Sequence, residues 1–200
     1  MSFQWIVDNA EEIQINKRGI VAQTVSRDQT VRSVSRGGAI WRFTVTPPSG
    51  YKWADARGYV ETIDNSDRFT VTQINFSKTA YAYIFGYQGN GAAPTSITVT
   101  QGSPTAQIGG GYTGGIRLKA GDLVQLSGQP YVYSVVNTVT LANTSVTLNR
   151  PVLETSGTYT LVVGQNVSFK LICTQIPDYK ITPGGLIQWT GPFTFVESLA

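Results

Sequence analysis

Short runs of apolar and β-branched residues alternate with polar residues along most of the chain, and Gly, Pro, Asn or Asp ends most of these runs. Alternation with a period of two is typical of strands that bury one face. The pattern occurs in GIVAQTVS, TVRSVS, AIWRFTVTPP, RFTVTQINF, AYAYIFGY, TSITVTQ, DLVQLSG, YVYSVVNTVTL, SVTLN, TYTLVVG, VSFKLICTQI and FTFVE. The sequence therefore predicts an all-β fold.

One segment, Tyr51–Arg68, has a helical spacing instead. Its apolar residues recur at steps of three or four, which places them on one face of a helix. They are Trp53, Ala56, Tyr59 or Val60, and Ile63. A glycine inside the segment weakens it, so we expect one short helix of about ten residues.

Glycine content divides the chain into parts. Residues 102–115 contain six glycines, which is typical of a connector and not of a core element. Residues 116–156 then hold at least three strand patterns, and we interpret them as a small inserted β module, a barrel or a sandwich. Residues 1–101 and 157–200 are expected to form the main β-barrel domain together.

Some aromatic residues and the single thiol are expected in the core. Trp41 and Phe43 alternate along one strand pattern, so both side chains point to the same side of that strand. Cys173 is the only cysteine and lies in the apolar run FKLIC, where a buried, reduced thiol is expected. With one cysteine, no intrachain disulfide or Cys-x-x-Cys motif can form.

The composition excludes most catalytic chemistry. The chain has no histidine, which rules out Ser-His-Asp and Cys-His nucleophilic sites and histidine metal sites. The densest acidic spot, Asp64–Arg68, lacks the pattern of a calcium loop. We therefore expect no enzyme, no metal and no cofactor. A hydrolase that uses two carboxylates across a cleft stays open as an alternative.

Charged residues make up 14% of the chain, against roughly 25% in an average soluble protein, and this favours a chain that packs against other subunits. Six basic residues and one acid, Asp28, lie between Lys17 and Arg42. Arg32 and Arg36 are an even number of residues apart and are expected on one strand face. We predict that Arg27, Arg32 and Arg36 meet an acidic partner surface, although phosphate would suit them as well.

The sequence predicts neither a membrane span nor secretion. No apolar run approaches the ~18 residues of a span, and the first residues lack the basic and then apolar order of a secretion signal. We therefore expect a protein that is made and folded in a cytosol.

Several stretches resemble the distal-tail and baseplate proteins of bacteriophages. In RGGAIWRFTVTPPSG a Gly-Gly turn precedes a Trp-Arg strand, and AYAYIFGYQGN resembles the aromatic strand before the connector of those proteins. The stretch IRLKAGDLVQLSGQPYVYSVVNTVTLANTSVTLNRPVL resembles the small β module of many tail proteins, and YKITPGGLIQWTGPFTFVES is similar to their closing hairpin. The resemblance is patchwise and covers about two thirds of the chain.

This resemblance implies a tail-tube-like split β-barrel or sandwich with one short helix and a small inserted β-barrel module. It also implies a virion structural protein that forms a ring homo-oligomer, expected to be a hexamer, and contacts other tail or baseplate proteins. Nucleic acid would be met only during its passage through a tail lumen. The alternative is a carbohydrate-binding β module of a phage receptor-binding apparatus, because exposed aromatic rings can pair with sugar faces.

The end of the chain is expected to form a closing hairpin. We predict that Leu186–Trp189 pairs with Phe193–Val196 across the turn TGP, since prolines in this segment interrupt a continuous ladder. Phe193 and Phe195 share one strand face and are predicted to be buried in the barrel. Trp189 is predicted to lie at a subunit interface.

Overall fold

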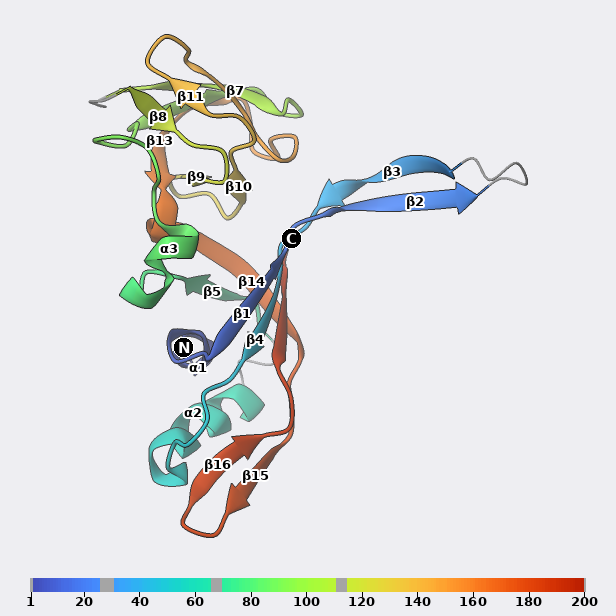
Figure 1. Cartoon of the computed structure of the whole chain (residues 1–200), viewed down its shortest axis with the longest axis vertical. Coiled ribbons are helices and arrows are strands. Elements are labelled where there is room, and N and C mark those ends of the chain that lie inside the picture. Colours follow the sequence, from blue (N-terminus) through green and yellow to red (C-terminus); the bar gives the residue numbers. More distant parts are fainter. Residues whose placement is uncertain (1, 26–30, 66–69, 111–114, 200) are drawn as a thin grey trace.

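The computed structural model describes residues 2–25, 31–65, 70–110 and 115–199, and for β2 and β3 it describes the backbone. The chain is mostly β, with 42% of residues in strands and 17% in helices, and its curled sheets include a half-barrel. The predicted β class is therefore confirmed at this coarse level. A small β module lies at one end, two helices and a hairpin lie toward the other, and a two-stranded arm projects from the middle (Figure 1).

The main sheet has five antiparallel strands in the order β1-β4-β17-β14-β5. Its strands are β1 (Glu12–Asn16), β4 (Arg42–Thr46), β5 (Thr72–Asn75), β14 (Ser168–Gln175) and β17 (Phe193–Glu197). The strands come from both ends of the chain, so the sheet joins the first 75 residues to the last 33. This pairing therefore brings together, in one sheet, strands that the module separates in the sequence.

Aromatic rings fill the core of the main sheet. Phe43 on β4 is paired in register with Phe195 on β17, and both rings are fully buried. Helix α1 (Ser2–Asp8) covers this face, and the ring of Phe3 contacts Phe193 and Phe195 edge-on, with centroids 6.2 and 5.2 Å apart. Such edge-to-face contacts add to the stability gained by burying large rings.

The small module, residues 96–163, contains a six-stranded sheet in the order β10-β9-β13-β6-β7-β12 and a two-stranded sheet of β8 and β11. Its first strands are β6 (Ser96–Val99), β7 (Thr105–Gly109), β8 (Ile116–Leu118) and β9 (Leu123–Leu126). Its later strands are β10 (Val132–Ser134), β11 (Val139–Thr140), β12 (Ser145–Thr147) and β13 (Gly157–Val163). Strand β13 pairs with β6 along its first half and with β9 along its second, which holds the sheet together.

These pairings group the strands differently from the predicted boundaries. Residues 102–115 were expected as a connector, but Thr105–Gly109 forms β7, which lies between β6 and β12 in the sheet. Strands β6 and β13 fall in the segments predicted for the main domain and belong to the module's sheet. Glycine content was a poor guide here, because Gly109 is itself the last residue of a strand that keeps its alternating burial.

The prediction of a single helix is wrong. Helix α2 (Trp53–Asn65) has 13 residues and buries Ala56, Val60 and Ile63, as the spacing indicates. Helix α1 was missed because its seven residues span less than the window in which periodicity is visible. The run AYAYIFGY was predicted as a strand but forms the 3₁₀ turn η2 (Thr79–Tyr81) and α3 (Ala82–Phe85).

The predicted closing hairpin is also wrong. Strand β16 (Leu186–Trp189) pairs with β15 (Tyr179–Thr182), and β17 pairs with β14 and β4 of the main sheet. The turn of the hairpin is Pro183-Gly184-Gly185, in which Gly185 N donates to Thr182 O and Gly184 has a φ of 101°. A proline followed by a glycine with positive φ is the preferred sequence of a type II turn.

Two chain segments join the module to the main sheet. One runs from β5 through α3 to β6, and the other from β13 through η3 (Gly164–Asn166) to β14. The two segments touch at Gly164, whose φ is 70° and where a Cβ would lie 2.7 Å from the backbone nitrogen of Tyr87. Only glycine fits this close approach without displacing backbone.

Candidate assembly surface

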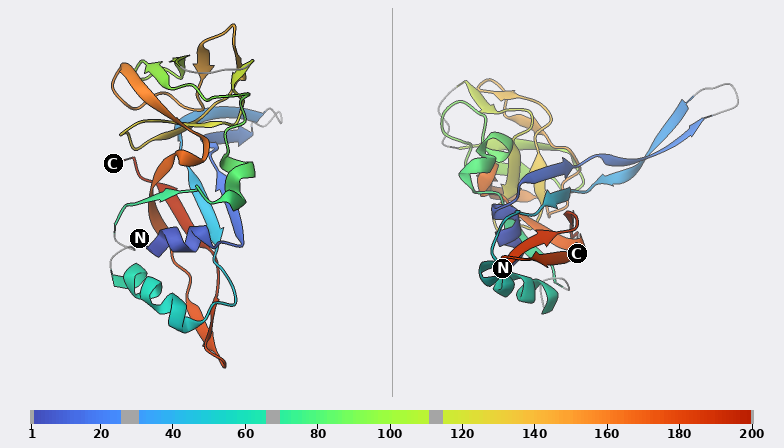
Figure 2. Two further views of the ribbon diagram at one scale, coloured as in Figure 1. Left: turned by 90° about the vertical axis from the view of Figure 1, so that its left-hand side faces the viewer. Right: turned by 60° about the horizontal axis from the view of Figure 1, so that its bottom comes forward.

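The arm consists of β2 (Gly19–Val25) and β3 (Val31–Ala39), which pair only with each other among the described strands. It extends away from the main sheet and the module (Figure 1, and Figure 2, right). An isolated two-stranded ribbon is marginally stable in water. The arm therefore gains its strand pairing from its own two strands alone among those described.

The pairing of the arm is regular from Val21↔Ser35 to Val25↔Val31. Between these pairs and Gly19↔Ala39 the register shifts, so three residues of β3 lie opposite one residue of β2. Arg32 lies in the regular part, opposite Thr24, whereas Arg36 lies in the shifted part. The regular alternation that the shared face of Arg32 and Arg36 assumes therefore extends only to Ser35, and Arg36 is the first residue beyond it.

The base of the arm is fixed by a buried ion pair. Arg150, which lies between β12 and β13, donates from both terminal nitrogens to the carboxylate of Glu197 on β17, each at 2.5 Å. The same guanidinium donates to Ala39 O at the end of β3 and to Val132 O on β10, both at 3.0 Å. One side chain therefore ties together the module, the main sheet and the arm.

A second contact supports the other strand of the arm. Lys17, two residues before β2, donates from Nζ to Ser134 Oγ at 2.8 Å and lies 5.4 Å from the ring centroid of Trp41. Burial lowers the pKa of the Lys17 ammonium. Trp41 itself donates from Nε1 to Val132 O at 2.8 Å. Both strands of the arm are therefore held at its base.

The two edges of the main sheet differ. At the β5 edge, the side chain of Gln4 donates to Asn75 O at 2.9 Å and accepts from Asn75 N at 3.1 Å, so it occupies the position of a neighbouring strand. Strand β1 pairs with β4 on one side and with no other described strand, and most of its residues are exposed. An open edge offers backbone groups that another chain can pair with.

Helix α2 and the β15–β16 hairpin form a lobe at the end of the molecule away from the module (Figures 1 and 2). Ile187 on β16 is fully buried against Ala56 and Val60 of α2. The backbone of the hairpin also bonds to the start of the helix, since Trp53 N donates to Gly185 O at 2.6 Å. The hairpin also exposes apolar side chains, among them Ile181 with an exposed fraction of 51%.

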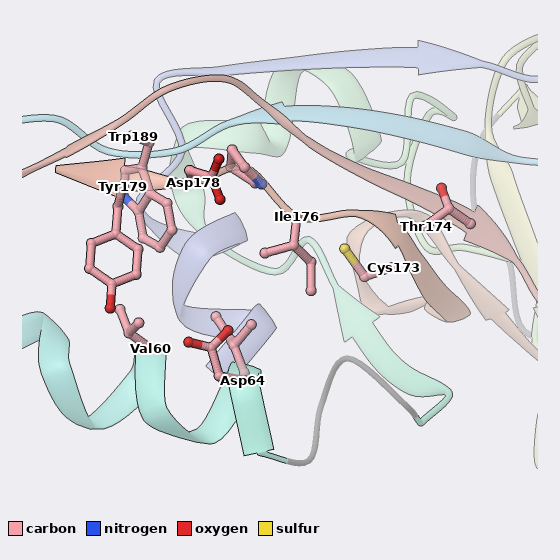
Figure 3. A pocket seen from close by; sticks show the side chains of 10 residues that line it. Val60, Asp64, Cys173, Thr174, Ile176, Asp178, Tyr179 and Trp189 are labelled. Carbon is pink, nitrogen blue, oxygen red and sulfur yellow. The ribbon is translucent and has the colours of Figure 1, made fainter.

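A pocket of about 670 Å³ lies between α2, the end of β14 and this hairpin. Figure 3 shows Asp64 on α2 facing the segment after β14, which carries Ile176 and Asp178. The rings of Tyr179 and Trp189 line the side of the pocket formed by the hairpin. Such a volume is typical of binding sites, which span roughly 300–1,000 Å³.

Negative charge dominates this pocket. The carboxylates of Asp64 and Asp178 have no hydrogen-bond or ion-pair partner in the described part of the chain. Partial burial, together with the charges of Asp64 and Glu61, raises the pKa of the Tyr179 hydroxyl. The pocket is therefore suited to a cationic group and not to an anion.

The aromatic rings of the pocket pack on one another. Tyr179 stacks on Trp53, with centroids 5.4 Å apart and planes at 21°. Trp189 contacts Tyr179 and Phe193 edge-on, at 5.5 and 5.0 Å. Its Nε1 is buried and has no hydrogen-bond partner among the described residues. No flat, fully open ring platform results from this packing.

The structure places the predicted site residues as follows. Trp41, Phe43, Cys173, Phe193 and Phe195 are all buried. Trp189, predicted at a subunit interface, is half-buried beside the pocket.

The predicted basic residues are not brought together as one described site. Arg32 and Arg36 lie on β3 of the arm, and Arg27 lies outside the described residues. Their predicted contact with a partner stays a prediction.

Sequence reasoning missed the Arg150–Glu197 pair and the α2 pocket. Arg150 and Glu197 are 47 residues apart, and no local pattern links them. A weak signal for the pocket existed in the Pro183-Gly184 turn, which predicts a hairpin of Tyr179–Thr182 with Leu186–Trp189.

Other kinds of site receive no support from the described residues. Among them, no three His, Cys, Asp or Glu side chains are grouped so that they could hold a metal ion. No described helix is long and apolar enough to cross a membrane. Neither the models of protein families nor the curated proteins contain a match for this chain.

Proposed function

We propose that this chain is a structural subunit of a phage tail or baseplate, which assembles with copies of itself into a ring and contacts other tail proteins. The arm carries this proposal. A two-stranded ribbon that only its base holds in place gains stability when a neighbouring subunit covers it. The proposed fold type is the tail-tube-like split barrel that the sequence resemblance implies, and the proposed location is the virion.

Two further features support assembly. The β1 edge of the main sheet is available for pairing with another chain, and Ile181 and Leu186 expose apolar surface on the β15–β16 hairpin. Both features lie on the body and not on the arm. A subunit of a ring needs at least two different contact surfaces, because head-to-tail contacts close into a ring.

Shortening the arm tests the proposal. Residues 23–33 can be replaced by Asn-Gly between Ala22 and Val34, which are paired in the arm, because a two-residue Asn-Gly turn suits an antiparallel hairpin. We expect the shortened chain to keep its thermal unfolding midpoint and to lose self-association in light scattering and electron microscopy. Tyr83→Ala, which removes an exposed ring of the body, should assemble like the unchanged protein.

The outcome that would overturn the proposal concerns the unchanged protein. A stable monomer that forms no rings at any concentration tested, and that never enters a tail particle, would exclude a structural ring subunit.

A carbohydrate-binding module is the second candidate, and the α2 pocket with Tyr179 and Trp189 favours it. Rings and carboxylates line many sugar sites, where the ring packs on the apolar face of a pyranose. Binding on a glycan array that Tyr179→Ala abolishes would support this function, and an array without any binding would remove it.

A further inference from the structure

Charge is unevenly distributed over the molecule. Ten of the twelve acidic residues lie in the described part of the chain, and three of these, Asp122, Glu154 and Glu197, are buried. The other seven all belong to α1, the turn into β1, β1 itself, α2 or the residue before β15. They are Asp8, Glu11, Glu12, Asp55, Glu61, Asp64 and Asp178. The α2 end of the molecule also carries Lys52, Arg57 and Lys180, so its negative charge is local to the pocket, whose lining holds Asp64 and Asp178 and no basic residue.

The arm and its base carry the opposite charge. The segment Lys17–Arg42 holds six of the fifteen basic residues and one acid. The arm points away from α2 and the β15–β16 hairpin of its own chain (Figure 1), so a contact between the arm and the pocket must join different copies. Complementary potentials of this kind speed the encounter of two surfaces and fix their orientation.

We propose that the pocket between α2 and the β15–β16 hairpin binds the arm of a second copy of this chain, with an arginine of β3 held by Asp64 and Asp178 beside the ring of Tyr179. This inference names the partner surface within the ring assembly proposed above and rests on that proposed function. Arg32 and Arg36 are the arginines of β3.

The chemistry of the pocket selects arginine. Carboxylates only accept hydrogen bonds, and a guanidinium only donates them, so the two groups match without an unsatisfied atom. A guanidinium is also planar and less strongly hydrated than an ammonium, and it packs on aromatic rings. A sugar offers acceptors as well as donors, and the ring faces it would need are partly occupied by the packing of Tyr179 on Trp53.

The geometry of this contact leads to a ring or a filament. The arm and the pocket are different surfaces of one molecule, so the contact is head-to-tail and each copy can bind two neighbours. The fixed base of the arm, held by Arg150 at Ala39 O, sets the angle between successive copies. A rigid angle of this kind is what a closed ring requires.

Charge reversal tests the contact from both sides. The arm variant is Arg32→Glu with Arg36→Glu, and the pocket variant is Asp64→Lys with Asp178→Lys. Lys119→Glu, an exposed lysine of the module, is the control for a change of charge elsewhere. By sedimentation velocity at low salt, the arm variant and the pocket variant should each self-associate at least about tenfold more weakly, because like charges then face each other. The control should assemble normally.

Two further samples, one chain with all four reversals and one mixture of the two variants, decide whether arm and pocket bind each other. The chain with all four reversals should assemble again, since the opposite charges are restored with their sides exchanged. An equimolar mixture of the arm variant and the pocket variant should also assemble again, with the two chains alternating, because the acidic arm of one fits the basic pocket of the other and the basic arm of the other fits the acidic pocket of the first. Circular dichroism of every variant checks that it is folded.

The outcomes separate this inference from the proposed function. If the unchanged protein forms rings and the arm variant does so equally well, the inference is wrong and the ring function stands. If the arm variant and the pocket variant both lose assembly, and the chain with all four reversals does not regain it, arm and pocket do not bind each other. If the unchanged protein stays monomeric, the proposed function itself fails. Glycan binding that the pocket variant loses would assign the pocket to a sugar instead.

Discussion

The main sheet and the small module are both antiparallel, but their cores are made of different side chains. The core of the main sheet is rich in aromatic rings that come from α1, β4, β14 and β17, including Phe3, Phe43, Phe169 and Phe195. The core of the module consists mostly of Val, Leu and Ile, with Tyr133 as its buried ring in the described residues. A few large rings connect elements that are distant in sequence, whereas many small side chains fill a module whose strands are close in sequence.

The surfaces of the two regions differ as well. Between residues 79 and 169 the sequence has five charged residues, and four of them are buried. They are Arg117, Asp122, Arg150 and Glu154. The main body and the arm hold the other charged residues of both signs. Between residues 79 and 169 only Lys119 therefore adds a charged side chain to the surface.

The largest expected effect is the loss of one ring from the main core. Phe195→Ala should lower the free energy of unfolding by roughly 3–5 kcal/mol, because a fully buried ring leaves a cavity between α1, β4 and β17. Chemical denaturation measures it, with Tyr83→Ala as the control because that ring is 80% exposed. A Phe195→Ala protein as stable as the unchanged chain would contradict the central place of this ring in the core.

The next effect concerns the junction between the two regions. Arg150→Met should destabilise the protein by roughly 3 kcal/mol, since it leaves the carboxylate of Glu197 buried without its partner. We also expect the module and the main sheet to unfold in separate steps in calorimetry. In the Arg150→Met protein, the additional substitution Glu197→Leu should restore part of the stability, because it also removes the buried carboxylate. A single transition at the original temperature in Arg150→Met would show that the ion pair does not couple the regions.

A smaller effect is expected in the aliphatic core of the module. Ile97→Val removes one buried methylene and should lower the free energy of unfolding by about 1 kcal/mol. The same denaturation experiment measures it, with Phe195→Ala as the reference for the loss of a whole ring. A loss as large as that of the ring would mean that the module is as sensitive to single side chains as the main sheet.

The smallest effect is the pH dependence that Cys173 contributes. Burial raises the pKa of the Cys173 thiol from 9.0 to about 12. The folded state therefore keeps its proton where the unfolded state loses it, so this contribution is fully present below pH 9 and is lost as the pH rises toward 12. Cys173→Ala should show a shallower decline of stability over this range.

Thiol labelling provides a second measurement on Cys173. At pH 8 the native protein should react with a thiol reagent far more slowly than the unfolded chain, because the thiol at the edge of the α2 pocket is largely buried and protonated. Rapid labelling of the folded protein would contradict both its burial and its raised pKa.

Local patterns in the sequence determined several features of this protein. Alternation identified most strands, and the spacing of Ala56, Val60 and Ile63 identified α2, because period is a property of neighbouring residues. The burial of Phe193 and Phe195 followed from their even spacing on one strand. These features depend on which side of an element a residue occupies, and the sequence encodes that directly.

The partners of each element were decided by the tertiary structure. Strand β17 satisfies the same alternation whether it pairs with β16, as predicted, or with β14 and β4, as observed. The choice depends on the fit of Phe195 against Phe43 and Phe3, residues about 150 or more positions away, which no local pattern contains. For the same reason the sequence showed a basic segment between Lys17 and Arg42, but only the fold placed most of it on a projecting arm and brought Asp64 and Asp178 to one pocket.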